Sequence, residues 1–137
     1  MAKTMCVILG ALFLVVGLAG FAAPDALGMH LSTAHNVVHL VSGALALYIG
    51  LAGTYAAARS FCILFGVIYG LLGILGFLMG SPGPEKMLTV IPDQLVLGRM
   101  DHIVHVLLAA LFLIGGLVRQ PAMTAAAPRA PDREPEP

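Results

Sequence analysis

Four of the five histidines in the chain occur as two pairs, each at the start of an apolar segment. His35 and His39 lie in "HNVVHLVSGALAL", and His102 and His105 lie in "DHIVHVLLAALFL". Imidazole is the commonest metal ligand in proteins, and it also forms hydrogen bonds and exchanges protons near neutral pH. Residues three or four apart share one face of a helix, so each pair presents its two rings in the same direction.

The composition predicts that the segments following these histidines cross a membrane. Hydrophobic residues make up 59% of the 137 residues and charged residues 10%, whereas soluble proteins contain about 25% charged residues. A membrane-spanning helix needs about 20 mostly apolar residues. Four segments meet this requirement, at about 5–23, 35–57, 60–79 and 101–118. The net charge is zero and no basic run occurs, which argues against nucleic acid as a partner.

We therefore expect an all-α membrane protein, a four-transmembrane-helix bundle over residues 1–118 whose main partner is the lipid bilayer. Residues 119–137 are rich in proline, alanine and charges, so they should form a disordered cytoplasmic tail. A tight turn at 57–60 should join the second and third helices and hold Arg59 as a topology anchor.

The distribution of Lys and Arg predicts the orientation, because short cytoplasmic segments are enriched in these residues. The side that holds both termini carries five of them: Lys3, Arg59, Arg119, Arg129 and Arg133. The other side carries only Lys86 and Arg99. We expect a bacterial cytoplasmic (inner) membrane protein with both termini in the cytoplasm.

The sequence indicates an internal repeat of two helical hairpins. Residues 5–21 align without a gap on 61–77 and match Cys6 with Cys62 and Gly20 with Gly76, among others. The second and fourth segments align His39 with His105 and Asn36 with His102. This pattern predicts two tandem hairpins related by an axis along the membrane normal. The second outer loop is the longer one, by ten residues.

The two histidine-bearing helices should run in the same direction, which places their histidines at similar depth near the outer face. A polar side chain without a partner is costly in hydrocarbon, so these groups should face the bundle interior. We expect a polar cluster at the outer end, formed by Asn36, His39, Asp101 and His105.

Three interpretations of this cluster remain open. The first is a hydrogen-bonded clamp that fixes helix packing, without a cofactor. The second is a site for haem b or a divalent metal ion, since helical bundles build such sites from facing helices. Its candidate ligands are His35, His39, His102 and His105. The third is a relay of a small transporter or channel, because buried ionisable groups often mark ion pathways.

No catalytic residue is predicted, because neither a nucleophile elbow nor a Ser-His-Asp arrangement is recognisable. The leading interpretation is a non-enzymatic small membrane protein with a structural polar cluster. Haem or metal binding and transport are the alternatives. A homo-oligomer or a larger membrane complex would be compatible with each of them.

Several of these residues form short motifs: Asn36 three before His39, the Ala58–Arg59 pair before a glycine-rich helix, and Asp101 four before His105. In these motifs the chain resembles a family of small bacterial four-span membrane proteins of unknown function. The resemblance covers about 30–118 and implies the same architecture, with no activity attached to it. The chain departs from the family pattern at His102, where asparagine would be expected, and at His35.

Overall fold

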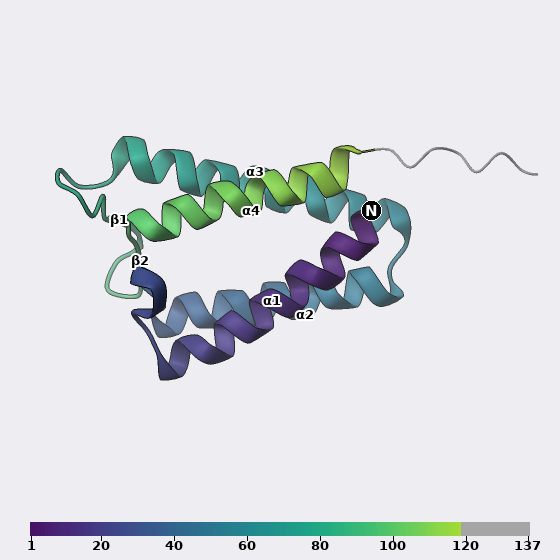
Figure 1. Ribbon diagram of the computed structural model, residues 1–137, viewed down its shortest axis with the longest axis horizontal. Coiled ribbons are helices and arrows are strands. Elements are labelled where there is room, and N and C mark those ends of the chain that lie inside the picture. Colours follow the sequence, from purple (N-terminus) through teal and green to yellow (C-terminus); the bar gives the residue numbers. More distant parts are fainter. Residues whose placement is uncertain (119–137) are drawn as a thin grey trace, which may run out of the picture.

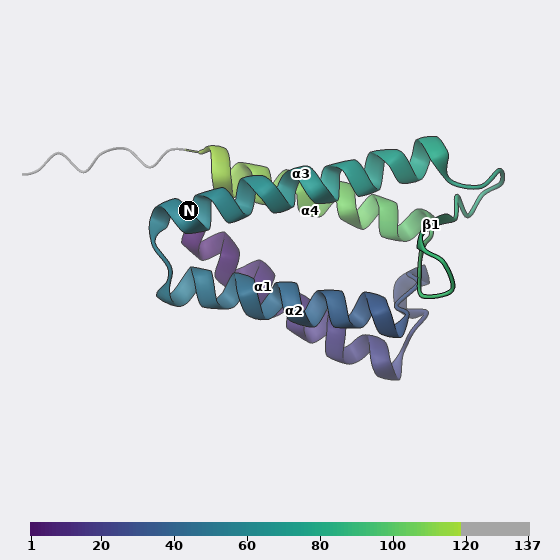
Figure 2. The same cartoon turned by 180° about the vertical axis from the view of Figure 1, so that it is seen from behind.

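The structure, a computed structural model that describes residues 1–118, consists of four long helices and a short β-hairpin. The elements are α1 (Ala2–Ala22), the 3-10 turn η1 (Ala26–Gly28), α2 (Thr33–Ala52), α3 (Tyr55–Met79), β1 (Leu88–Ile91), β2 (Leu95–Leu97) and α4 (Arg99–Leu117). Helices α1 and α2 pack as one antiparallel hairpin and α3 and α4 as a second, and the two hairpins lie side by side (Figures 1 and 2). The predicted tail at 119–137 lies outside the described residues.

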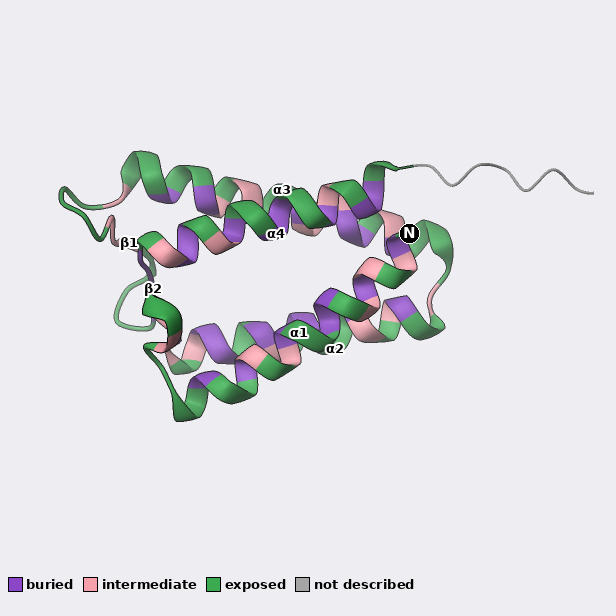
Figure 3. Ribbon diagram, in the orientation of Figure 1, coloured by how far each residue is buried: buried purple, intermediate pink, exposed green. Residues whose placement is uncertain are grey.

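All four helices are long and apolar enough to cross a membrane. Their outward faces expose large apolar side chains such as Val15, Val41, Leu71 and Leu107, whereas the inward faces are buried (Figure 3). A protein in water would have to bury such faces, but lipid solvates them at little cost. The predicted fold class, an all-α four-helix membrane bundle, is therefore confirmed.

The turn between α2 and α3 differs from the prediction. It lies at Gly53 and Thr54 instead of 57–60, and Arg59 lies inside α3. The Thr54 side chain accepts a hydrogen bond from the backbone N–H of Ala57 at 3.1 Å, as expected of a helix N-cap. Alanine and arginine are both good helix formers, so the segment before Ser60 continues the helix.

The two ends of the bundle differ in composition. The end with His35, His39 and His105, called the histidine end below, is covered by η1 and by the antiparallel strands β1 and β2 (Figure 1). The Ser32 hydroxyl donates to the Gln94 carbonyl at 2.7 Å and so ties the β-hairpin to the start of α2. The opposite end, called the cysteine end, contains Cys6 and Cys62.

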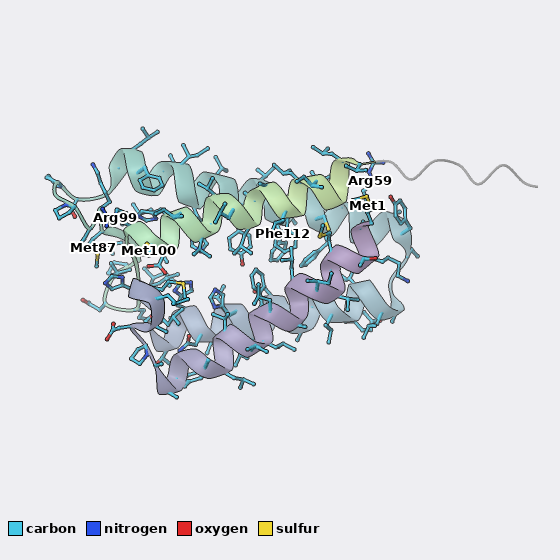
Figure 4. All side chains as sticks on the ribbon, viewed as in Figure 1. Met1, Arg59, Met87, Arg99, Met100 and Phe112 are labelled. Atoms are coloured by element: carbon cyan, nitrogen blue, oxygen red, sulfur yellow. The ribbon has the colours of Figure 1, made fainter. Side chains whose placement is uncertain are left out.

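Aromatic side chains fill the space between the two hairpins at mid-bundle. Phe13 of α1 contacts Tyr69 of α3 and Phe112 of α4, with ring centroids 5.6 Å and 6.0 Å away. Tyr69 and Phe112 stack in parallel at 5.9 Å. Figure 4 shows Phe112 projecting between the hairpins. This aromatic layer separates the histidine end from the cysteine end.

Candidate functional site

Three imidazole rings meet at the histidine end. The ring of His35 lies 4.5 Å from that of His39 and 6.0 Å from that of His105, measured between centroids. Because His35 and His39 are one turn apart on α2 and His105 is on α4, the group joins the two hairpins. All three residues are at most 5% exposed. His39 and His105, which were expected at the same end of the bundle, thus both lie beside the ring of His35.

Neighbouring aromatic rings hold two of these imidazoles in place. Phe13 stacks on His39 at 5.4 Å with an interplanar angle of 13°, and Tyr69 packs against His105 at 5.2 Å. The mid-bundle aromatic layer therefore also forms the floor of the histidine site.

The three imidazoles differ in their hydrogen bonds. The Nδ1 atom of His35 lies 2.9 Å from the carbonyl oxygen of His30 and donates to it, which leaves its Nε2 as an acceptor. In contrast, the buried Nδ1 atoms of His39 and His105 have no hydrogen-bond partner within residues 1–118. A buried polar atom without a partner is unfavourable, so these two rings are candidates to bind something else.

Two cavities border the three histidines. The larger, of about 230 Å³, lies between α1, α2 and α4, and its wall includes His35, His39, Asp101 and His105 among otherwise mostly apolar side chains. The smaller, of about 50 Å³, lies on the other side of the same imidazoles and is bounded by Tyr69 and the β-hairpin. Leu12 and Leu27 line the larger cavity and are themselves exposed, so this cavity opens to the outside of the bundle.

Asp101 has a structural position beside the cavity. Its carboxylate accepts hydrogen bonds from the backbone N–H of Gly98 at 2.8 Å and of His30 at 3.1 Å. The first bond caps the N-terminus of α4, and the second holds the loop that precedes α2. The Nδ1 atom of His30 also lies 3.5 Å from the carboxylate. Asp101 therefore links the two hairpins at the histidine end.

Asn36 and His102, the remaining members of the predicted set, lie within their own hairpins. A Cβ atom at Gly20 of α1 would overlap the Asn36 side chain, and one at Gly76 of α3 would overlap His102. The amide of Asn36 donates to the Leu31 carbonyl at 3.1 Å, and Nε2 of His102 donates to the Lys86 carbonyl at 2.8 Å. The Oδ1 atom of Asn36 and the Nδ1 atom of His102 have no partner within residues 1–118, but neither residue lines the two cavities described above.

The positions of the potential metal-ligating side chains can be compared with the metal interpretation. Among residues 1–118, no group of three or more His, Cys, Asp or Glu side chains is placed to hold a metal ion. Cys6 and Cys62 lie at the other end of the bundle, beyond the aromatic layer. Of the four candidate metal or haem ligands, His102 is turned toward Gly76, and the other three face the cavities.

The sequence did not point to some residues of the site. Phe13, Tyr69 and His30 were not among the predicted site residues, although the first two pack against His39 and His105 and the backbone of His30 contacts both His35 and Asp101. One available signal was the predicted repeat, which aligns Phe13 with Tyr69.

Comparisons with known proteins identify a family for almost the whole described chain. The model of a family described as "Domain of unknown function (DUF4383)" matches residues 3–118. Searches against curated proteins and against solved structures gave no significant match. The match agrees with the resemblance to a family of unknown function, while the bacterial origin and the short motifs remain predictions. The chain belongs to the DUF4383 family, a domain of unknown function.

Proposed function

We propose that this chain is a small, non-enzymatic membrane protein that binds an uncharged ring compound in the larger cavity at the histidine end. The ligand class is a phenol or quinone with an apolar tail. The supporting observation is that the almost completely buried side chains of His39 and His105 line a mostly apolar cavity, and that the Nδ1 atom of each has no hydrogen-bond partner within residues 1–118.

The size and opening of the cavity favour a single ring. A water molecule occupies about 30 Å³ in the liquid, so about 230 Å³ accommodates on the order of eight non-hydrogen atoms. A six-membered ring with two oxygen substituents has this size. Because the exposed Leu12 and Leu27 border the cavity, a hydrocarbon tail would extend from the ring into the surrounding lipid.

The polar groups favour an uncharged ligand. Imidazole nitrogens donate to a carbonyl or hydroxyl oxygen or accept from a hydroxyl, and Nε2 of His35 supplies a further acceptor. The carboxylate of Asp101 borders the same cavity and would repel an anion. Its oxygens are already bound to two backbone N–H groups, which leaves it less available to a cation.

The predicted polar cluster, together with the neighbouring candidate ligand His102, would then have two roles. Asp101, Asn36 and His102 have backbone partners and would act as the structural clamp of the leading sequence interpretation. His39 and His105 would act in binding. This division follows which side chains line a cavity, because Asn36 and His102 also keep a polar atom without a partner but lie away from both cavities.

The alternatives have less structural support. The four pyrrole rings of a haem require several times the space of a single ring, and no set of three metal-ligating side chains is gathered within residues 1–118. For a transporter or channel, the packed rings of Phe13, Tyr69 and Phe112 lie between the cavity and the cysteine end. A continuous polar path would need these rings to separate.

For the location, the proposal keeps the bacterial cytoplasmic membrane, with the cysteine end and both termini on the cytoplasmic side. Lys3 and Arg59 are at that end, and three further arginines follow α4 in the sequence. The ligand would then enter from the outer half of the bilayer.

The proposal is tested by nitrogen NMR on the full chain, labelled with ¹⁵N-histidine and placed in lipid nanodiscs. The probe is 4-nonylphenol, and the matched control ligand is nonylbenzene, which lacks only the hydroxyl group. We expect the phenol to shift the ring nitrogens of His39 and His105 in a saturable way. His102 serves as an internal reference because its Nε2 is bonded to Lys86 within the second hairpin.

Two variants, His39→Phe and His105→Phe, assign the signals and weaken binding, while a phenylalanine ring keeps the packing on the aromatic layer. If the phenol leaves both rings unshifted, or if nonylbenzene produces the same shifts, the proposed function is wrong. Elemental analysis of the same wild-type sample tests the metal alternative. Stoichiometric iron, copper or zinc would show that the protein binds a metal and would overturn the proposed function.

A further inference from the structure

The two cysteines of the chain meet at the cysteine end, although they are 56 residues apart in sequence. The Sγ atoms of Cys6 in α1 and Cys62 in α3 lie 3.6 Å apart, and both side chains are completely buried. Both are free thiols. The contact therefore joins the first hairpin to the second, and it is independent of the histidine site.

The surroundings of the two thiols are reciprocal. The thiol of Cys6 donates to the carbonyl oxygen of Ala58 at 3.7 Å, and the thiol of Cys62 donates to that of Ala2, also at 3.7 Å. Alanine at both positions lets α1 and α3 approach closely at this point. Each sulfur thus points toward the other helix, so the two are already oriented toward each other.

We propose that Cys6 and Cys62 form a redox modification site, in which a peroxide oxidises the two thiols to a disulfide that links the hairpins. One thiol gives up its proton as its sulfur attacks a peroxide oxygen, the O–O bond breaks, and the leaving hydroxide takes up that proton, so that a sulfenic acid and one water form from hydrogen peroxide. The second sulfur then attacks the sulfenic sulfur, the S–O bond breaks, and a second water leaves. Two thiols are oxidised, and one peroxide is reduced to two waters.

The geometry is close to that of the product. A disulfide has an S–S distance of about 2.05 Å, so the two sulfurs must approach by about 1.5 Å from the present 3.6 Å. Gly115 of α4 lies beside Cys62, where an added Cβ would be 3.5 Å from the sulfur, an ordinary contact distance. Because both thiols are buried, the oxidant must be small and uncharged, which hydrogen peroxide is.

The alternative is that the two cysteines only pack against each other, since buried thiols in apolar surroundings are commonly inert. The test uses the full chain in nanodiscs, treated with hydrogen peroxide beside an unstructured cysteine peptide as a reference. Thiols are counted by alkylation after denaturation, and the intact mass is measured. Cys6→Ser and Cys62→Ser are the matched controls, because serine keeps the size and a hydrogen-bonding group.

We expect the monomer to lose two hydrogen atoms in mass and its free thiols to fall from two to none. A reductant should restore both thiols, and a Cys6–Cys62 cross-linked peptide should be found after digestion. The single variants should instead form a sulfenic acid that a dimedone reagent traps. The proposal is overturned if both thiols stay free at a dose that oxidises the reference peptide. It is equally overturned if the products are only intermolecular disulfides or sulfinic acids.

Discussion

Replacing Asp101 should destabilise the protein more than replacing His30, whose imidazole lies beside the Asp101 carboxylate. The carboxylate accepts from two backbone N–H groups, Gly98 at 2.8 Å and His30 at 3.1 Å, and the aspartate is 1% exposed. Hydrogen bonds to a charged group contribute about 1.5–3 kcal/mol each, and loss of a helix N-cap alone costs about 0.5–2 kcal/mol. With allowance for relaxation of the loops, Asp101→Ala should lower the free energy of unfolding by about 2–4 kcal/mol.

Two related variants separate the contributions of the Asp101 charge and of the His30 imidazole to the free energy of unfolding. Asp101→Asn keeps one oxygen that can accept both bonds, since both go to Oδ2, but it removes the charge, so it should lose about half as much, roughly 1–2 kcal/mol. His30→Ala removes only the imidazole, which is 38% exposed and 3.5 Å from the carboxylate, and keeps the backbone donor. A partly exposed pair of this kind contributes about 1 kcal/mol or less. Asp25→Ala, at an exposed carboxylate without a side-chain capping bond, is the matched control.

The assay is unfolding in mixed micelles of mild detergent and dodecyl sulfate, followed by circular dichroism. The chain has no tryptophan, but its two buried thiols provide a second signal, through a dye that fluoresces on reacting with exposed cysteine. The reasoning is refuted if Asp101→Ala stays within about 0.5 kcal/mol of the wild type, which is the range of ordinary surface substitutions. It is also refuted if His30→Ala costs as much as Asp101→Ala.

Three further predictions concern helix packing, the β-hairpin and orientation. Gly20→Ala and Gly76→Ala should each destabilise the protein by about 1–3 kcal/mol in the same unfolding assay, because the new methyl group overlaps a buried polar side chain. Gly70→Ala, where the methyl group would meet only Ala109 at 3.5 Å, should be nearly neutral; equal effects would contradict the packing argument. Leu97→Ala should enlarge the smaller cavity and cost about 2–5 kcal/mol, and a neutral result would mean that Leu97 does not support it. A fluorescent protein fused to the C-terminus should fluoresce in bacteria while an alkaline phosphatase fusion stays inactive, and the reverse would invert the proposed orientation.

The sequence was sufficient to predict the number of membrane-spanning helices, because that number depends only on the length of the apolar segments. It was less informative at the helix ends, which depend on single side chains. The start of α3 follows from the Thr54 cap, a signal present in the sequence but outweighed by the charge of Arg59. The β-hairpin was also missed, although Pro92–Asp93 between β-branched and aliphatic residues is a typical turn, and Asp93 adopts a positive φ of 58°.

For the site, sequence reasoning could place histidines at a common depth but could not fix the rotation of each helix about its axis. The rotation of α2 and α4 about their axes determines which side chains face the cavities. His39 and His105 do so, whereas Asn36 and His102 face glycines of their own hairpins. The predicted repeat held part of this information, because it aligns Gly20 with Gly76 and Asn36 with His102.

Duplication of a hairpin remains a prediction, and two groups of reciprocal contacts support it. The contacts of Gly20 with Asn36 and of Gly76 with His102 occur at aligned positions, and so do the bonds of Cys6 to Ala58 and of Cys62 to Ala2. The predicted repeat also relates residues in the walls of the two cavities. Their walls share His35, His39 and His105, and Phe13 of the larger cavity aligns with Tyr69 of the smaller.

The difference between these two cavities follows from the longer outer loop of the second hairpin. That loop contains β1 and β2, whose residues Val90, Leu95 and Leu97 line the smaller cavity. The larger cavity is bordered instead by η1, a shorter segment that leaves exposed Leu27 at its edge. If the two hairpins were fully symmetric, an axis near the histidines would relate two cavities of similar size. The extra ten residues occupy one of them, so only about 50 Å³ remains there against about 230 Å³ on the other side. The asymmetry therefore favours the side where the loop is short as the place for the proposed binding site.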